Sequence, residues 1–506
     1  MARLTPPGSR PRRRLLQQAL AATAAPWLAP AARATAGPAG QQAPAASAAP
    51  TVPPEPARQE VRATWLTTTA NAALASPRAT GETMRALREI GLNTVYVESW
   101  KNGYTQFPSR VLERTIGVAA RPGQALQDPS DPPGTRPARD LLEEALIEAH
   151  RQGLVCVAWF EYGFMAAHGS THNHLRRLKP EWLSRDRRGL EVAPNGFVWM
   201  NPLRPEVRAF LLDLTLEAVA RYDLDGVQFD DRIVWPHVTM GYDDYTRAAY
   251  AAEHGGRAPP DDPHDAAWMR WRAGKLDALA RPFAAALRAA LPGRVVSLSP
   301  AVFPWSYENY LLDWPSWGRW PAAERWTEVV PQAYRLSLEA FERTWAEQVQ
   351  ALEQAGSYRP HELLAGIRIV GDGRDSSWEQ LRGSIALARR LGNGGHVLWF
   401  SRGVLDLYAR ELTDLYGQDG PAHSPFFPAR WRRRSLPLHT PADRGGRRTW
   451  ALPPREPGRY RLIGHDGRRW HYLDEPVPAD ATTLALEPRW QAAELLVDRR
   501  GERPAA

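Results

Sequence analysis

A single cysteine stands among the 506 residues of the sequence, so no intramolecular disulfide can form. Cys156 lies inside the apolar segment LVCVAWF, a setting that predicts a buried thiol rather than a reactive nucleophile. Lysine is nearly as scarce, occurring only at positions 101, 179 and 275, whereas arginine is abundant. This imbalance indicates a compositional preference rather than a phosphate-binding surface, and it argues against nucleic acid as a partner.

The amino-terminal segment lacks the sustained apolarity of a membrane span, because Pro26 and Pro30 interrupt it. It carries consecutive arginines at 12–14, then a moderately apolar stretch that ends in small residues resembling a cleavage site. This pattern predicts a twin-arginine-type export signal over residues 1–36, with a basic tail or an uncleaved anchor as the alternative. Residues 37–57, rich in Ala, Pro and Gln, are typical of a disordered linker. We expect an exported protein, periplasmic or extracellular, with no membrane span once the signal is removed.

Excess positive charge is confined to the two ends of the chain. The formal net charge is +8, but residues 1–36 contain six arginines and no acidic residue, which leaves the remainder at +2. Residues 425–506 contain sixteen arginines against ten acidic residues, so the segment between the ends is slightly acidic. The basic carboxyl-terminal segment predicts an affinity for anionic polymers.

Eight short apolar runs alternate with amphipathic helical patterns between residues 58 and 420. Met84, Leu87 and Ile90, for example, recur at helical spacing before the run NTVYVES. Eight repeats of strand and helix predict an α/β fold of the (β/α)8 TIM-barrel type, whose active site lies at the carboxyl ends of the strands. The expected strands are 61–66, 93–99, 154–161, 226–231, 294–300, 327–334, 363–370 and 396–401.

Two connections and the last segment depart from this repeat. Residues 100–138 and 162–203 follow the second and third strands, and they are long enough to build a substrate cleft on that face. Residues 425–506 show short alternating runs divided by Gly, Asp and Pro, which predict a small β-rich module.

Acidic residues end three neighbouring strands of the expected barrel. In the strand DGVQFDD, alternation places Gln228 and Asp230 on one face and the apolar residues on the other. Since the apolar residues should face the helices, Asp230 should point into the barrel mouth, and Asp231 then begins the loop. Glu98 and Glu161 end the two preceding strands. The alternative is that these acids form structural ion pairs with nearby arginines.

Aromatic residues are abundant, and many of the 21 tryptophans lie in loop-like segments. Flat apolar rings stack on sugars, although packing in a large core explains them equally well. Polar side chains at strand or loop ends bind sugar hydroxyls or satisfy structural hydrogen bonds. The stacking candidates are Trp100, Tyr104, Trp199 and Trp235, and the polar candidates are Asn201, Gln332 and Tyr334.

Four segments carry a resemblance to a known family: VYVESWKNG, EAHRQGLVCVAWFEYGF, NPLRPEVRAFLLDLTLEAVARYDLDGVQFDD and VVPQAYR. They resemble the glycosyl hydrolase-like 10 family of bacterial exported proteins, and the likeness runs in order from about 60 to 415. The resemblance implies a TIM barrel that acts on a bacterial glycan, and some members are held to cleave peptidoglycan stripped of its peptides. Glu161 stands where many relatives have asparagine, which is typical of a subgroup. The spacing of Asp225, Gly226 and Asp230 is also similar to the fourth-strand motif of α-amylase-type hydrolases, whose final aspartate is the nucleophile.

Glycoside hydrolysis usually needs two carboxyl groups, and strand spacing ranks the candidate pairs. Adjacent strands lie about 4.8 Å apart. Glu161 and Asp230 therefore fit the roughly 5 to 5.5 Å of a retaining pair, which we favour, whereas Glu98 and Asp230 fit the wider inverting separation. The aromatic neighbours of Glu161 should raise its pKa and suit an acid, whereas Asp230 beside Arg232 should stay ionised. These residues predict a monomeric, cofactor-independent, exported glycoside hydrolase. The resemblance implies a bacterial cell-wall or related polysaccharide as its substrate, and the basic module is the candidate for attachment to the wall.

Two other functions remain open. His168, His172 and His174 in HGSTHNH favour a metal-dependent carbohydrate deacetylase, although no further His or Cys with ligand spacing joins them at a strand end. The third hypothesis is a barrel that binds glycans without cleaving them, with tryptophans as platforms and carboxylates as hydrogen-bond acceptors.

Overall fold

The computed structural model describes residues 58–121, 139–427, 432–444, 447–454, 458–478 and 480–499. All of them belong to one compact unit, Glu55–Ala506. The predicted export signal (1–36) and linker (37–57) lie outside the described residues.

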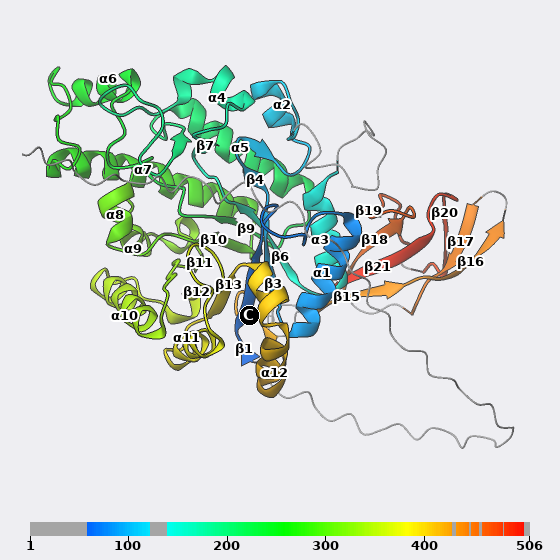
Figure 1. The fold of residues 1–506 in the computed structure, drawn as a ribbon. Helices are drawn as coiled ribbons and strands as arrows, with labels where there is room; N and C mark the ends of the chain where they lie inside the picture. Colours follow the sequence, from blue (N-terminus) through cyan, green and yellow to red (C-terminus); the bar gives the residue numbers. More distant parts are fainter. Residues whose placement is uncertain are drawn as a thin grey trace, which may run out of the picture. The chain divides into compact units, whose positions relative to one another are not determined.

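A parallel eight-stranded sheet forms the centre of the molecule (Figure 1). Its strands follow the order β11-β10-β9-β6-β3-β2-β13-β12, and parallel bridges Val329↔Leu363 and Gln332↔Gly366 join the two outer strands and close the barrel. All eight expected strands are present, so the predicted (β/α)8 barrel is confirmed. Their bounds are β2 Val61–Leu66, β3 Thr94–Glu98, β6 Val155–Phe160, β9 Gly226–Phe229, β10 Val295–Leu298, β11 Glu328–Val329, β12 Leu364–Arg368 and β13 Gly395–Trp399.

Helices cover the outside of the barrel, and their ends follow from local sequence. Helix α1 (Pro77–Ile90) begins at Ser76, whose side chain accepts from the Ala79 amide at 3.1 Å, and it ends at Gly91, whose φ of 105° is a left-handed conformation that favours glycine. None of the described helices is both long and apolar enough to cross a bilayer. The other main helices are α3 Leu141–Arg151, α5 Pro205–Arg221, α6 Asp244–Glu253, α7 Ala266–Ala290, α10 Leu338–Gln354, α11 Trp378–Arg390 and α12 Ala409–Asp419, and the shorter ones are α2 Arg110–Ile116, α4 His174–Leu178, α8 Trp305–Tyr310 and α9 Trp314–Trp317.

Strand β9 has the orientation that its alternation predicted. Phe229 faces outward and meets Phe283 of α7, with 5.1 Å between the ring centroids. Gln228 faces inward, where its amide accepts from Trp65 Nε1 at 2.7 Å and donates to Ser297 Oγ at 2.9 Å. The residue after β9, Asp230, therefore continues the inward-facing side of the strand.

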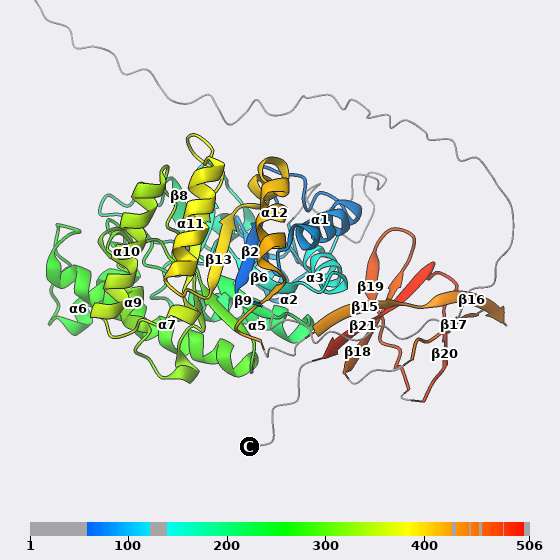
Figure 2. The same ribbon diagram turned by 90° about the horizontal axis from the view of Figure 1, so that it is seen from below.

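The last segment forms two antiparallel sheets, which confirms the expected β-rich region. One has the order β15-β21-β18-β19 and the other β16-β17-β20. Both figures show the first sheet beside α3 (Figures 1 and 2). The strands are β15 Arg432–Pro437, β16 His439–Arg444, β17 Arg447–Ala451, β18 Arg459–His465, β19 Trp470–Tyr472, β20 Thr483–Leu486 and β21 Ala492–Arg499.

Buried contacts join this carboxyl-terminal region to the barrel. Ile147 of α3 packs in an apolar cluster with Ile463, Trp470 and Leu496. Arg433 forms a bidentate ion pair with Asp225 at 2.7 and 2.8 Å, and both side chains are buried. Because Asp225 directly precedes β9, this joint lies at the amino ends of the strands, away from the carboxyl ends.

Candidate functional site

Three adjacent strands each deliver a carboxyl group to the carboxyl end of the barrel. Glu98 is the last residue of β3, Glu161 follows β6, and Asp230 follows β9. The sheet order places β6 between β3 and β9. The structure thus brings together the residues that sequence alone predicted, and Asp231 joins them from the following loop.

Glu98 is fully buried and saturated with hydrogen bonds. Its Oε2 accepts from Thr67 Oγ1 at 2.7 Å, from the Thr68 amide at 3.1 Å and from Lys101 Nζ at 2.7 Å. Its Oε1 accepts from Thr68 Oγ1 and from Gln106 Nε2. Burial opposes ionisation, but Lys101 and these donors outweigh it and lower the pKa of Glu98. Glu98 therefore holds the surrounding loops as a carboxylate and has little capacity left for a substrate.

Glu161 has a different environment, although it is also buried. Lys101 Nζ lies 3.0 Å from its Oε2, and Arg232 Nη1 lies 3.9 Å from its Oε1. Within the described residues no neutral donor bonds to its side chain. Burial and the charge of Glu98 outweigh both cations and raise the pKa of Glu161, as the sequence predicted.

Asp230 accepts three hydrogen bonds. Its Oδ1 accepts from the Asp231 amide at 2.9 Å and from Gln332 Nε2, and its Oδ2 accepts from Arg232 Nη1 at 2.6 Å. The sequence predicted that Asp230 beside Arg232 stays ionised; burial and the charge of Asp231 raise the pKa of Asp230, and Arg232 opposes this shift.

Charge balance within the cluster explains the opposite behaviour of these acids. Lys101 and Arg232 face four carboxyl groups, and Arg232 alone contacts three of them: Glu161, Asp230 and Asp231. Two cations cannot neutralise four buried or half-buried carboxylates. The pKa values of Glu161 and Asp230 are accordingly both raised, and such perturbed carboxyl groups are typical of acid–base sites.

Two of the predicted substrate-binding residues lie beside this cluster. Gln332 donates to Asp230 and also to the backbone oxygen of Ser299 at 3.0 Å. Burial and the charge of Asp230 raise the pKa of Tyr334, whose ring stacks on Trp399 with 5.8 Å between centroids.

The other five predicted binding residues are in the interior, where they offer no open face to a sugar. Trp100 packs on Phe210, and the Trp235 indole donates to a backbone oxygen. The Asn201 amide donates to Asp243 at 2.9 Å, and the Tyr104 hydroxyl contacts His174 Nδ1 at 2.7 Å. The buried members are Trp100, Tyr104, Trp199, Asn201 and Trp235. Packing in a large core, the alternative for these aromatics, accounts for them.

The three histidines of HGSTHNH do not converge on one point. His168 contacts Ser170 on the surface, whereas His174 contacts Tyr104. Across the described part of the chain there is no group of three or more His, Cys, Asp or Glu side chains arranged to hold a metal ion.

Lys101 is the functional residue that the sequence reasoning missed. It follows β3 by three positions and bridges Glu98 and Glu161, at 2.7 and 3.0 Å. The scarcity of lysine was the available signal, because Lys101 is one of only three lysines in the chain.

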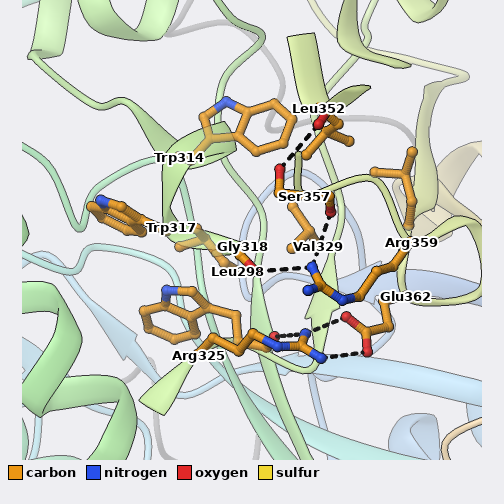
Figure 3. A pocket seen from close by; sticks show the side chains of 12 residues that line it. Leu298, Trp314, Trp317, Gly318, Arg325, Val329, Leu352, Ser357, Arg359 and Glu362 are labelled. Atoms are coloured by element: carbon orange, nitrogen blue, oxygen red, sulfur yellow. Dashed lines mark hydrogen bonds and ion pairs between the residues drawn. The ribbon is translucent and has the colours of Figure 1, made fainter. Parts of the chain in front are cut away.

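A separate apolar pocket lies between α9, β11 and α10 (Figure 3). Trp314, Trp317 and Leu352 line it, and the ion pair between Arg325 and Glu362 borders it. It encloses about 30 Å³, room for about one water molecule. None of the four clustered acids lines it, so it is no part of the candidate site.

The sequence model of the glycosyl hydrolase-like 10 family matches residues 60–370, more than half of the chain. This chain belongs to the glycosyl hydrolase-like 10 family. The match covers every acid of the cluster, together with Lys101 and Arg232. Membership indicates a glycosidase-type function with a carbohydrate as the substrate.

Curated relatives of this glycosyl hydrolase-like 10 protein include two glycosyl hydrolases. DigH of Escherichia coli (strain K12) is 27% identical over 152 residues, which are 29% of this chain and 32% of DigH. YngK of Bacillus subtilis (strain 168) is 26% identical over 172 residues, which are 33% of this chain and 31% of YngK. The alignments thus span about a third of the relatives' own length.

Solved glycoside hydrolase structures share the fold. The glycoside hydrolase domain of PgaB (BpsB) from Bordetella bronchiseptica is 14% identical with a TM-score of 0.51, over 71% of this chain and 99% of that domain. The catalytic domain of β-amylase from Paenibacillus polymyxa is 10% identical with a TM-score of 0.50, over 72% of this chain and all of that domain. At these identities the likeness concerns the fold alone.

Proposed function

We propose that this family member is an exported glycoside hydrolase that retains anomeric configuration, with Asp230 as nucleophile and Glu161 as acid and base. One observation carries the proposal: two buried carboxyl groups lie side by side at the ends of β6 and β9. These strands pair directly, with Phe160 opposite Phe229, so the next residues are neighbours. Adjacent strands give a spacing of about 5 Å, which is typical of retaining pairs.

The donors around each acid favour Glu161 as the proton carrier. The three hydrogen bonds to Asp230 all approach as donors, so a proton on either of its oxygens would meet another donor. Burial raises the pKa values of both acids, so the hydrogen-bond geometry decides between them, and Glu161 contacts only two cations. We therefore assign the transferable proton to Glu161 and the negative charge to Asp230.

The reaction steps follow from these two roles, with Glu161 as the proton carrier and Asp230 as the nucleophile. An Asp230 oxygen attacks the anomeric carbon while Glu161 protonates the glycosidic oxygen, so the leaving sugar departs as an alcohol. Glu161, now a carboxylate, then removes a proton from water, whose oxygen displaces Asp230 from the same carbon. Arg232 contacts both acids and balances their charge as it alternates.

The proposed substrate is a bacterial cell-wall polysaccharide, such as peptidoglycan stripped of its peptides. The support is the family membership, the predicted export signal and the basic carboxyl-terminal segment. Purified protein should convert such glycans to fragments that each gain the mass of one water, and product NMR should show the starting anomer first. Inverted products contradict retention. Binding without any mass change favours the glycan-binding alternative, and loss of acetyl groups favours deacetylation.

Glu161→Gln should separate substrates by their leaving groups. The amide cannot protonate a glycosidic oxygen, so turnover of natural glycans should fall by roughly 10²- to 10⁴-fold. Activated aryl glycosides need little protonation and should lose far less. Rates measured across pH should also lose the alkaline limb that deprotonation of Glu161 causes in the wild type. Equal losses on both substrates would contradict the acid role.

A further inference from the structure

Trp305 differs from every other tryptophan in the described residues, because it alone is exposed, at 46%. It begins α8, in the connection that follows β10, so it lies on the same end of the barrel as Asp230. The core does not need this indole, since nearly half of its surface faces solvent. An exposed indole on the active-site end offers a flat apolar face to a ligand.

Tyr310 connects Trp305 to the acid cluster. The two rings lie 5.4 Å apart between centroids. The Tyr310 hydroxyl accepts from Asn195 Nδ2 at 2.9 Å, and its ring lies 6.0 Å from that of buried Trp199. The Trp235 amide donates to the Tyr310 backbone oxygen at 3.1 Å, and Trp235 belongs to the connection after β9 that also carries Asp231. Tyr310 therefore joins Trp305 to the connection that carries Asp231.

We propose that Trp305, supported by Tyr310, is a stacking platform for a sugar ring one or more units away from the bond that Glu161 and Asp230 cleave. This inference rests on the proposed function and adds a binding subsite to it. A pyranose whose ring substituents are equatorial presents axial C–H groups on its faces, and these apolar faces pack on aromatic rings. Trp305 therefore binds a pyranose through such a face, and a chain of N-acetylglucosamine units provides one.

Titration calorimetry with a ladder of N-acetylglucosamine oligomers of increasing length tests the platform on the full chain. In an Asp230→Asn background, which the proposed mechanism leaves unable to cleave the oligomers, affinity should increase by roughly tenfold when the oligomer becomes long enough to reach Trp305, as expected for one good ring contact. Trp305→Ala should remove this increase, and Trp305→Phe should restore most of it. Leu391→Ala is the matched control, because Leu391 is an exposed apolar residue, 40% exposed, at the end of α11, before β13 begins.

The outcomes separate this inference from the proposed function. If affinity increases with oligomer length in Trp305→Ala as it does with Trp305 present, and the wild type hydrolyses glycans, the platform is refuted and the proposed hydrolase function is retained. A wild-type protein that neither binds nor cleaves any glycan overturns both.

Discussion

Asp230→Asn is expected to lower turnover by about four orders of magnitude or more, while the protein remains folded. Asparagine keeps the shape of the side chain but cannot attack the anomeric carbon. Its amide would also face the donors of Arg232 and Gln332 that now bind a carboxylate. Turnover of an aryl glycoside, measured together with the thermal unfolding midpoint, gives the result.

Asp231→Asn is the matched control for this prediction. Asp231 is the adjacent acid, contacts the same Arg232 at 3.3 Å and is 29% exposed, so the substitution removes a similar charge from the same cluster. We expect it to cost much less activity than Asp230→Asn. Full activity in folded Asp230→Asn would refute the mechanism, and the reverse ranking would exchange the roles of the two aspartates.

Arg433→Ala is expected to lower the free energy of unfolding by about 3 to 5 kcal/mol, because it leaves a buried carboxylate without its guanidinium partner. Burial opposes the ionisation of Asp225, but Arg433 and His150 outweigh it and lower its pKa below the usual range. Denaturant titration measures the loss. Arg489→Ala is the control, since that arginine and its partner Glu487 are both exposed and their ion pair should contribute little.

The loss of unfolding free energy in Arg433→Ala should depend on pH, because His150 also contacts Asp225. Because the folded pKa of Asp225 lies below its unfolded value, the ion pair stabilises the protein above about pH 4 and less as the pH falls further. His150 Nε2 lies 3.0 Å from Asp225, and burial and Arg433 lower the pKa of this histidine. In Arg433→Ala the pKa of His150 should rise, because the positive charge of Arg433 no longer lowers it. In mild acid, protonated His150 then supplies Asp225 with a positive partner in place of the guanidinium. The destabilisation should be smaller at about pH 5.5 than at about pH 8, and an equal loss at both values would contradict this assignment.

The joint around Arg433 changes how residues 425–506 should be tested. The sequence predicted a small β-rich module, and its affinity for the cell wall remains a prediction. A chain shortened near Gly420 would leave Asp225 without Arg433 and would uncover Ile147 of α3. Loss of activity after such truncation would therefore report damage to the barrel as well as any role of the module.

The barrel could be predicted from sequence because its signals are local. Each strand is a short apolar run bounded by polar residues, and alternation within DGVQFDD correctly oriented Gln228 and Asp230. The same reasoning collected Glu98, Glu161 and Asp230 at one end, because parallel strands end together.

The other features of the fold and of the site depend on contacts between distant parts of the chain, which no local sequence pattern predicts. The Asp225–Arg433 ion pair joins residues 208 positions apart. Asp225 was compared with an amylase motif, but it is part of this structural joint. The tryptophans show the same limit, because only the tertiary fold decides that Trp100 and Trp235 are buried whereas Trp305 is exposed.

The closure of the barrel has a consequence for heat resistance. Strands β11 and β12 meet through isolated bridges instead of a continuous ladder, and Gln332 belongs to one bridge while it donates to Asp230. Local opening begins where few backbone hydrogen bonds hold neighbouring segments. Each opening of this seam would draw the Gln332 amide away from Asp230, the proposed nucleophile. Warming should therefore inactivate the proposed hydrolase reversibly at temperatures where most of the barrel is still protected from amide exchange.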